Sequence, residues 1–383
     1  MSSTQLHLRR LPGLLLGLAM LAAPAAQAAA PGAEVCDRPL PAGSGDTATA
    51  IVRTACLEHK AWFQPFIDSN GRMASIEVTE AERTRLRDDT PAWQRVARYW
   101  RESGTLSSMI HIAGARSCMY PGQGRETDSD CRAYIVDNPW SAAFVSWVMT
   151  RASVPGFAGS PRHVDYITRA WRDPAASPYL HADPFLASAA PGDLLCYLRE
   201  TGQALGPEGL RGLLAGNGQP MPQRSHCDIV VAANVDDDRT LYLIGGNVFD
   251  AVTMRLLPLD AEGRLLASEV RLPVRTVPAA ASPDPAPAKA GRKNAARARK
   301  AARAGRADTT TAAAAVAPGA MPGEQAATAS AGAAGGDPGQ ASGDCRPGNQ
   351  AACSFNRRDW VVLLRLKPQA QLRSGEPIPA SPE

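Results

Sequence analysis

Hydrophobic and polar positions recur with a helical period in the first half of the chain. Residues 47–66 carry Ala, Val, Leu and Trp at helical spacing and predict a helix. The stretch "DTPAWQRVARYW" at 89–100 predicts another, with its proline in the first turn. A "TEAE" capping box at 79–82 predicts a helix between them. Residues 104–137 lack clean periodicity and are rich in Gly, Ser and Asp, so we expect a long loop there.

The stretch "NPWSAAFVSW" at 138–147 predicts the start of a buried helix that continues to about Arg151. Asn138 suits the N-cap and Pro139 the first helical position, which places Ser141 in the first turn. The stretch "SPRHVDYITRAW" at 160–171 predicts a further short helix.

The pattern changes to short strands at residue 192. The segments are rich in β-branched residues or leucine and are separated by turn residues: "GDLLCYLR", "HCDIVVAAN", "TLYLIGGNV", "AVTMRLLPL" and, after a long excursion, "DWVVLLRLK" at 359–367. A run of helices followed by a run of strands predicts an α+β domain with the N-terminal helices packed on an antiparallel sheet.

The excursion at 278–350 is built from Ala, Pro, Gly, Thr and Ser, and we expect it to be disordered because it has few large apolar residues to bury. Its segment 289–306 holds eight basic residues and no acidic one, so the remainder of this chain of net charge +4 is acidic. The basic segment is either a solvated insertion or an electrostatic contact for an anionic polymer or a membrane surface. It has no interleaved aromatic residues, so we expect no nucleic-acid partner.

The first 28 residues have the pattern of a signal peptide, with two arginines before an apolar run and a small-residue cleavage pattern. We therefore expect a periplasmic or secreted protein without a transmembrane span. Eight cysteines in an exported chain indicate disulfides, although eight cysteines allow 105 connectivities. Proximity along the chain favours the pairs Cys36 with Cys56, Cys118 with Cys131, Cys196 with Cys227, and Cys345 with Cys353.

Three short segments carry candidate chemistry. Ser141 lies where free backbone N–H groups favour a developing anion. The strand "SHCDIVV" places His226 and Asp228 on one face and Cys227 on the other. Asn247 follows two glycines that allow a close approach of the backbone. A nucleophile, a base and an orienting polar group form the arrangement that acyl transfer requires.

Each candidate also has a structural interpretation. Ser141 suits a helix start, His226 a strand edge, and Asn247 a tight turn. Trp140 is a candidate wall of the substrate cleft, and His163 is a candidate lining residue or a simple helix-start polar residue. The histidines are scattered and do not pair closely with cysteines, so we expect no metal site and no cofactor.

The ordered motifs "PWSAAFVSW", "PGDLLCY", "SHCDIVV" and "GGN" resemble the CHAP and NlpC/P60 amidase-endopeptidases, which are papain-like enzymes of bacterial cell walls. More narrowly, the chain resembles the exported domain of unknown function 2272 family. The resemblance implies a papain-like fold, with Ser141 as nucleophile, His226 as general base, and Asn247 as the orienting residue. The resembled enzymes use cysteine where this chain has Ser141, and Asp228 would supply the charge that neutral Asn247 lacks.

These observations imply a signal peptide at 1–28, a helical extension at 29–89, a papain-like domain at 90–277, the insertion at 278–350 and a final strand with a tail at 351–383. We expect a hydrolase of amide or peptide bonds in peptidoglycan. Two alternatives remain open: a catalytically silent module that binds a muropeptide or a partner protein, and an esterase, for which a serine nucleophile is suited.

Overall fold

The computed structural model describes residues 35–40, 42, 45–80, 84–199, 205–216, 221, 224–266, 354–356 and 359–374. Their helices are α2 (Asp46–Ala61), α3 (Ala92–Glu102), α4 (Arg125–Asp137), α5 (Ser141–Arg151), α6 (His163–Arg172), α7 (Gly206–Ala215) and α8 (Gln369–Ser374). Short 3-10 helices span Thr105–Met109, Ala115–Met119 and Val235–Asp237.

A single eight-stranded sheet has the order β2-β1-β7-β6-β5-β4-β8-β3. Its pairs are antiparallel except that β1 runs parallel to β7. The strands are β1 (Phe66–Ile67), β2 (Met73–Ala74), β3 (Tyr179–Ala182), β4 (Leu194–Arg199), β5 (Arg224–Ala233), β6 (Thr240–Val248), β7 (Ala251–Pro258) and β8 (Trp360–Leu366). The fold is therefore mixed α+β, as the sequence predicts.

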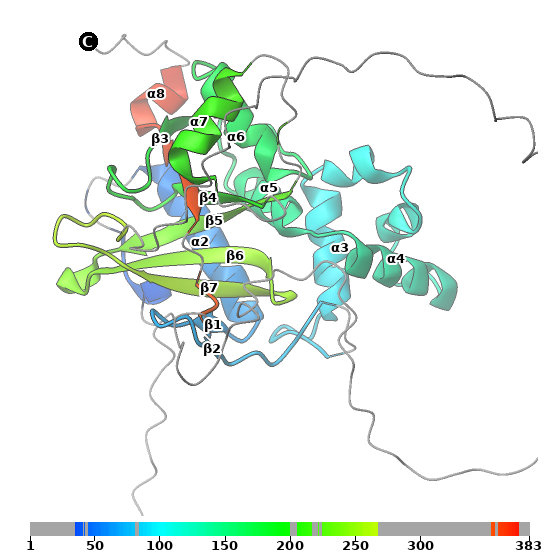
Figure 1. Cartoon of the computed structure of the whole chain (residues 1–383). Coiled ribbons are helices and arrows are strands. Elements are labelled where there is room, and N and C mark those ends of the chain that lie inside the picture. The colour runs from blue at the N-terminus through cyan, green and yellow to red at the C-terminus, as the bar shows by residue number, and fades with distance from the viewer. Residues whose placement is uncertain are drawn as a thin grey trace, which may run out of the picture. The chain divides into compact units, whose positions relative to one another are not determined.

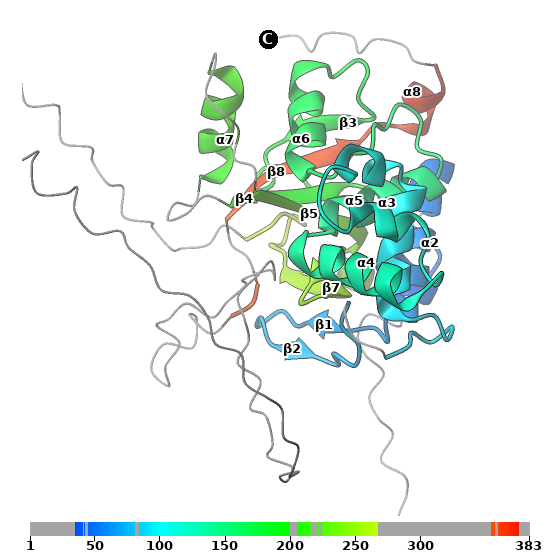
Figure 2. The same ribbon diagram turned by 90° about the vertical axis from the view of Figure 1, so that its right-hand side faces the viewer.

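The helices α2 and α5 lie over one face of this sheet, and α3 packs on α5 (Figures 1 and 2). Every second residue of β5 points toward these helices: Cys227, Ile229 and Val231 belong to the main hydrophobic core. Val230, between them, joins a second cluster on the other face, because successive side chains of a strand point to opposite sides. This alternation decides where the candidate site residues of β5 point.

Most of the predicted elements are confirmed. The structure contains α2, α3, α5, α6 and the five predicted strands β4 to β8, although α2 ends at Ala61. The start of α5 differs in detail: its N-cap is Trp140, and Asn138 instead ends α4. Ser141 is therefore the first residue of the helix.

Two predictions for the N-terminal half are wrong. The capping box does not start a helix: residues 75–80 are irregular, Glu80 is buried, and residues 81–83 lie outside the described part. The expected loop at 104–137 contains two 3-10 helices and α4. The polar sequence of α4 hides its helical period, while Cys131, Tyr134 and Ile135 hold the helix on the core. The strand β3 and the helix α7 were also not predicted.

Three of the expected disulfides are confirmed: Cys36–Cys56, Cys118–Cys131 and Cys196–Cys227. The fourth pair includes Cys345 and Cys353, which lie outside the described residues, as do the expected signal peptide and the insertion. Within the described ranges no helix has the length and apolar character needed to cross a membrane.

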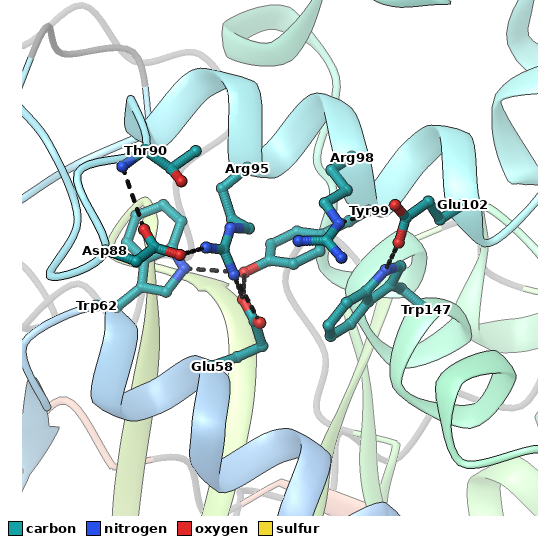
Figure 3. Close-up of polar contacts among 9 residues, drawn as sticks. All are labelled: Glu58, Trp62, Asp88, Thr90, Arg95, Arg98, Tyr99, Glu102 and Trp147. Atoms are coloured by element: carbon teal, nitrogen blue, oxygen red, sulfur yellow. Dashed lines mark hydrogen bonds and ion pairs between the residues drawn. The ribbon is translucent and has the colours of Figure 1, made fainter.

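A buried polar network joins α2 to α3 behind the site (Figure 3). Arg95 donates two hydrogen bonds to the Glu58 carboxylate, at 2.8 and 3.0 Å. The Tyr99 hydroxyl donates to Glu58 at 2.6 Å and accepts from the Trp62 indole at 2.9 Å. The rings of Trp62 and Tyr99 both pack against Trp140, with ring centroids 5.7 and 5.6 Å from it. This network therefore supports the residue that precedes Ser141.

Candidate active site

Ser141 is the first residue of α5, where the helix has backbone N–H groups without a partner inside the helix. The Trp140 carbonyl accepts the first helical hydrogen bond, from the Phe144 N–H at 2.9 Å. The N–H groups of Ser141 and the next two residues therefore have no partner within the helix, and no side chain caps this end. The positive end of the helix dipole adds to these donors, so the arrangement favours an anion beside the Ser141 hydroxyl.

The imidazole that contacts this hydroxyl belongs to His163, the first residue of α6. Its Nε2 lies 2.8 Å from the Ser141 Oγ, and its Nδ1 hydrogen-bonds the Tyr166 hydroxyl one turn along the helix. Burial raises the pKa of Tyr166 well above its ordinary value, with further contributions from Tyr179 and Asp165. Tyr166 therefore stays protonated and fixes the ring of His163 from behind.

His226 belongs to a second polar group on β5. Its Nε2 lies 2.7 Å from Asp228 Oδ1, and the other oxygen of Asp228 accepts from Arg255 Nε at 3.3 Å. Burial raises the pKa of Asp228, but His226 and Arg255 outweigh it and hold this pKa below its ordinary value. Asp228 thus supplies a negative charge beside His226, as expected from their shared face.

The two imidazoles are neighbours, with ring centroids 5.2 Å apart. The sequence predicts that His226 itself meets the Ser141 hydroxyl, whereas the hydrogen bond of Ser141 goes to His163. The period of the strand explains the difference. Cys227 points into the core on the side of α5 and forms its disulfide there, so His226 shares the opposite face with Val230. His163, on α6, contacts both Ser141 and His226.

The expected close approach at the two glycines is confirmed. A Cβ at Gly245 would lie 1.9 Å from Asp228 Oδ1, and a Cβ at Gly246 would lie 2.5 Å from the Cβ of Phe144. Gly245 makes room for the carboxylate on one face of β6, and Gly246 lets α5 pack on the other. The glycines therefore set the positions of both polar groups.

Asn247 holds the backbone that leads into α5. Its amide orientation is assigned from its neighbours: the oxygen accepts from the Trp140 N–H at 3.2 Å, and the nitrogen donates to Glu80 Oε2 at 3.2 Å and Asp250 Oδ1 at 3.3 Å. A register shift between Gly245 and Val248 and a φ of 57° at Asn247 aim the side chain in this direction. The contact to His226 that the resemblance implies is made by Asp228 instead.

Trp140 does not line an open cleft. Its side chain is fully buried, its indole donates to Glu80, and its ring packs among aromatic residues of the core. The site itself is nearly closed, with exposed fractions of 8% at Ser141, 2% at His163 and 3% at His226.

Three members of the site were not selected from the sequence: Tyr166, Arg255 and Glu80. Tyr166 follows His163 at helical spacing i, i+3, which is a usable signal. Arg255 is a charged residue within an apolar strand, which also indicates a buried partner. Glu80 lies in an irregular segment and has no such signal. In the ranges that the structure describes, no group of three or more His, Cys, Asp or Glu side chains is arranged to hold a metal ion.

Comparison with known proteins identifies the family. No curated protein and no solved structure matches the chain. Residues 87–366 match the family model described as "Uncharacterized protein conserved in bacteria (DUF2272)", and this match spans well over half of the 383 residues. The matched range contains α5, α6 and the strands β3 to β8, and with them Ser141, His163 and His226. The chain therefore belongs to the DUF2272 family.

Proposed function

We propose that the protein is an exported hydrolase of amide bonds in peptidoglycan, with Ser141 as its nucleophile. The observation that carries this proposal is the 2.8 Å contact between the Ser141 Oγ and His163 Nε2 at the start of a buried helix. A hydroxyl becomes a useful nucleophile when an oriented imidazole takes its proton and backbone donors stabilise the oxyanion. The three disulfides suit an oxidising compartment.

The packing supports a papain-like interpretation of the fold. The helix that carries the nucleophile packs on β5 and β6, which carry His226 and Asn247. The resemblance to the CHAP and NlpC/P60 enzymes implies a nucleophile helix packed on these strands, but His226 points to the face of β5 away from α5. Here a second imidazole, His163, lies between the helix and the strand histidine.

In the proposed reaction, the Ser141 Oγ attacks the carbonyl carbon while its proton passes to His163 Nε2. This requires the tautomer in which His163 Nδ1–H donates to the Tyr166 oxygen. The first-turn N–H groups of α5 bind the oxyanion. The C–N bond then breaks, the leaving amine takes the proton from His163, and a water molecule hydrolyses the acyl ester with His163 again as the base. The Asp228 carboxylate, beyond His226, stabilises the transient positive charge on the paired imidazoles.

The test is release of soluble fragments from purified peptidoglycan by the full chain and by single variants. We expect Ser141→Ala and His163→Gln each to lower the rate by roughly 10³-fold or more. Thr150→Ala is the matched control, because Thr150 is an exposed hydroxyl residue of the same helix. Equal activity of Ser141→Ala and wild type would show that the nucleophile is wrong. A large loss in His226→Gln with none in His163→Gln would assign the base to His226.

A catalytically silent binding module is the second candidate, and the small exposed fractions of Ser141, His163 and His226 favour it. In this case wild type binds soluble muropeptides without cleaving them, and Ser141→Cys gains hydrolysis that wild type lacks. Turnover of small esters without cleavage of peptidoglycan would instead indicate an esterase.

A further inference from the structure

The start of α5 is held from behind by residues of two other segments. The Glu80 carboxylate accepts the indole N–H of Trp140 and a hydrogen bond from the Asn247 amide. The Asn247 oxygen accepts the backbone N–H of Trp140 at 3.2 Å. Side chain and backbone of the residue before Ser141 are thus both bound to one cluster.

The hairpin between β6 and β7 is shaped for this contact. Asn247, Phe249 and Asp250 have φ values of 57°, 53° and 58°, in the left-handed region that residues other than glycine rarely adopt. Such conformations persist where the surrounding contacts hold them, and they gather at functional positions. Here they direct Asn247 and Asp250 toward Glu80, whose backbone N–H in turn donates to the Asp250 carbonyl at 2.8 Å.

The cluster brings two carboxyl groups together, and no cation of the described residues acts on Glu80. The Asn247 amide nitrogen donates to both Glu80 and Asp250, which places the two carboxyls on either side of it. Burial, together with the charge of Asp250, raises the pKa of Glu80 to about 8, although the hydrogen bond from Trp140 opposes the rise. Burial also raises the pKa of Asp250. Among the described residues that act on Glu80, Asp250 is the charged one, while Trp140 and Asn247 are neutral.

We propose that Glu80 is a positioning residue that, through Trp140 and Asn247, fixes the turn presenting the Ser141 hydroxyl. At neutral pH the Glu80 carboxyl is protonated and uncharged, so it is not repelled by Asp250. As the pH rises through about 8, it becomes a carboxylate beside a second one, and the repulsion loosens the turn. Glu80 precedes residue 87, where the family match begins, so a segment outside that match completes the site.

The role of Glu80 in catalysis rests on the proposed function, but its effect on the turn before Ser141 does not. The first experiment therefore follows the pH dependence of NMR signals from this turn. The full chain has seven tryptophans, and their indole N–H signals in ¹H–¹⁵N NMR spectra are recorded between pH 6 and 10 with the backbone signals of Ser141 and Ala142. We expect the Trp140 indole and both backbone signals to titrate together near pH 8 in wild type and in Ser141→Ala.

Glu80→Gln keeps the size and hydrogen-bonding capacity of the side chain but cannot titrate, so its Trp140 signal should stay constant. The matched control is Trp147 on the same helix, whose indole donates to Glu102 at 2.8 Å. Burial raises the pKa of Glu102, but Trp147 and Arg98 hold it below its ordinary value, so this signal should not move in that range. A constant Trp140 signal in wild type, or the same titration in Glu80→Gln, overturns the proposal.

The catalytic consequence is measured as kcat and KM against pH. We expect the kcat of wild type to fall about tenfold per pH unit above 8 at nearly constant KM, and the kcat of Glu80→Gln to show no such fall. A kcat that falls identically in both overturns the positioning role. If Trp140 and Ser141 titrate as expected while no form hydrolyses peptidoglycan, the proposed function fails and the coupling of Glu80 to the turn stands.

Discussion

Gly246 of β6 lies directly against Phe144 of α5, so close that a Cβ at this position would force one of the two elements to shift. The contact lets the helix that begins at Ser141 lie directly on β6, the strand that carries Asn247. The distance between helix and sheet, and with it the geometry of the site, depends on the absence of a side chain at Gly246.

We expect Gly246→Ala to destabilise the protein by about 1–3 kcal/mol, because the added Cβ would lie 2.5 Å from the Cβ of Phe144 and α5 would have to move. Chemical denaturation measures the change. Gly212→Ala is the matched control, since it lies within α7 with open space around it and should stabilise by up to about 1 kcal/mol. Equal effects of the two substitutions would show that the packing argument is wrong.

Removing the hydroxyl of Tyr166 should affect both stability and rate. Tyr166→Phe leaves Nδ1 of the buried His163 without this partner, which costs about 1–3 kcal/mol of unfolding free energy. We also expect kcat to fall roughly tenfold, because the ring is then free to adopt the unproductive tautomer. Thermal melts and turnover are the measurements, and Tyr120→Phe, on the exposed surface, is the control. An unchanged melt would argue against the hydrogen bond.

Removing one partner of the buried ion pair between Arg95 and Glu58 (Figure 3) should destabilise the protein strongly. Arg95→Met leaves the buried Glu58 carboxylate without its charged partner, and we expect a loss of about 3–5 kcal/mol. The double substitution Glu58→Leu with Arg95→Met should recover part of this loss, because neither charge of this buried pair then remains. Arg98→Met, which removes a half-exposed pair with Glu102 on the same helix, should change the unfolding free energy by less than about 1 kcal/mol.

His59 should make the protein less stable in mild acid. Burial, with a smaller contribution from Lys60, lowers its pKa to about 4, although a hydrogen bond to the Pro65 carbonyl at 2.9 Å opposes the shift. In the unfolded chain the His59 imidazole becomes protonated as the pH falls through 6.5, whereas in the folded chain it does so only near pH 4. The contribution to stability is therefore complete above about pH 6.5 and is lost as the pH falls through about 4.

Within that window, His59 should change the free energy of unfolding by up to about 1.4 kcal/mol per pH unit. Denaturant midpoints measured from pH 4 to 7 test this, with His59→Gln expected to reduce the slope. His111→Gln is the control, because His111 is exposed. A slope that is the same in all three proteins would assign the acid sensitivity to other groups.

Much of the fold could be predicted from local pattern. The consecutive strands β4 to β7 pair with each other, and the amphipathic helices have a clear period. The three disulfides join cysteines 13 to 31 residues apart. These features involve residues that are close along the chain. The two glycines before Asn247 also indicated a close backbone approach without any structure. The helix α4 was missed because its sequence is polar, and it is the contact of Cys131, Tyr134 and Ile135 with the core that stabilises it.

The sequence by itself determined that Ser141 lies in the first turn of a helix, that His226 and Asp228 share one face of a strand, and that Cys227 points to the other. Only the tertiary structure decided which imidazole reaches the hydroxyl. Periodicity along a strand gives relative faces, but it does not tell which face receives α5. Packing assigned that face to the Cys227 disulfide, so His163, supplied by a separate helix, makes the contact with Ser141.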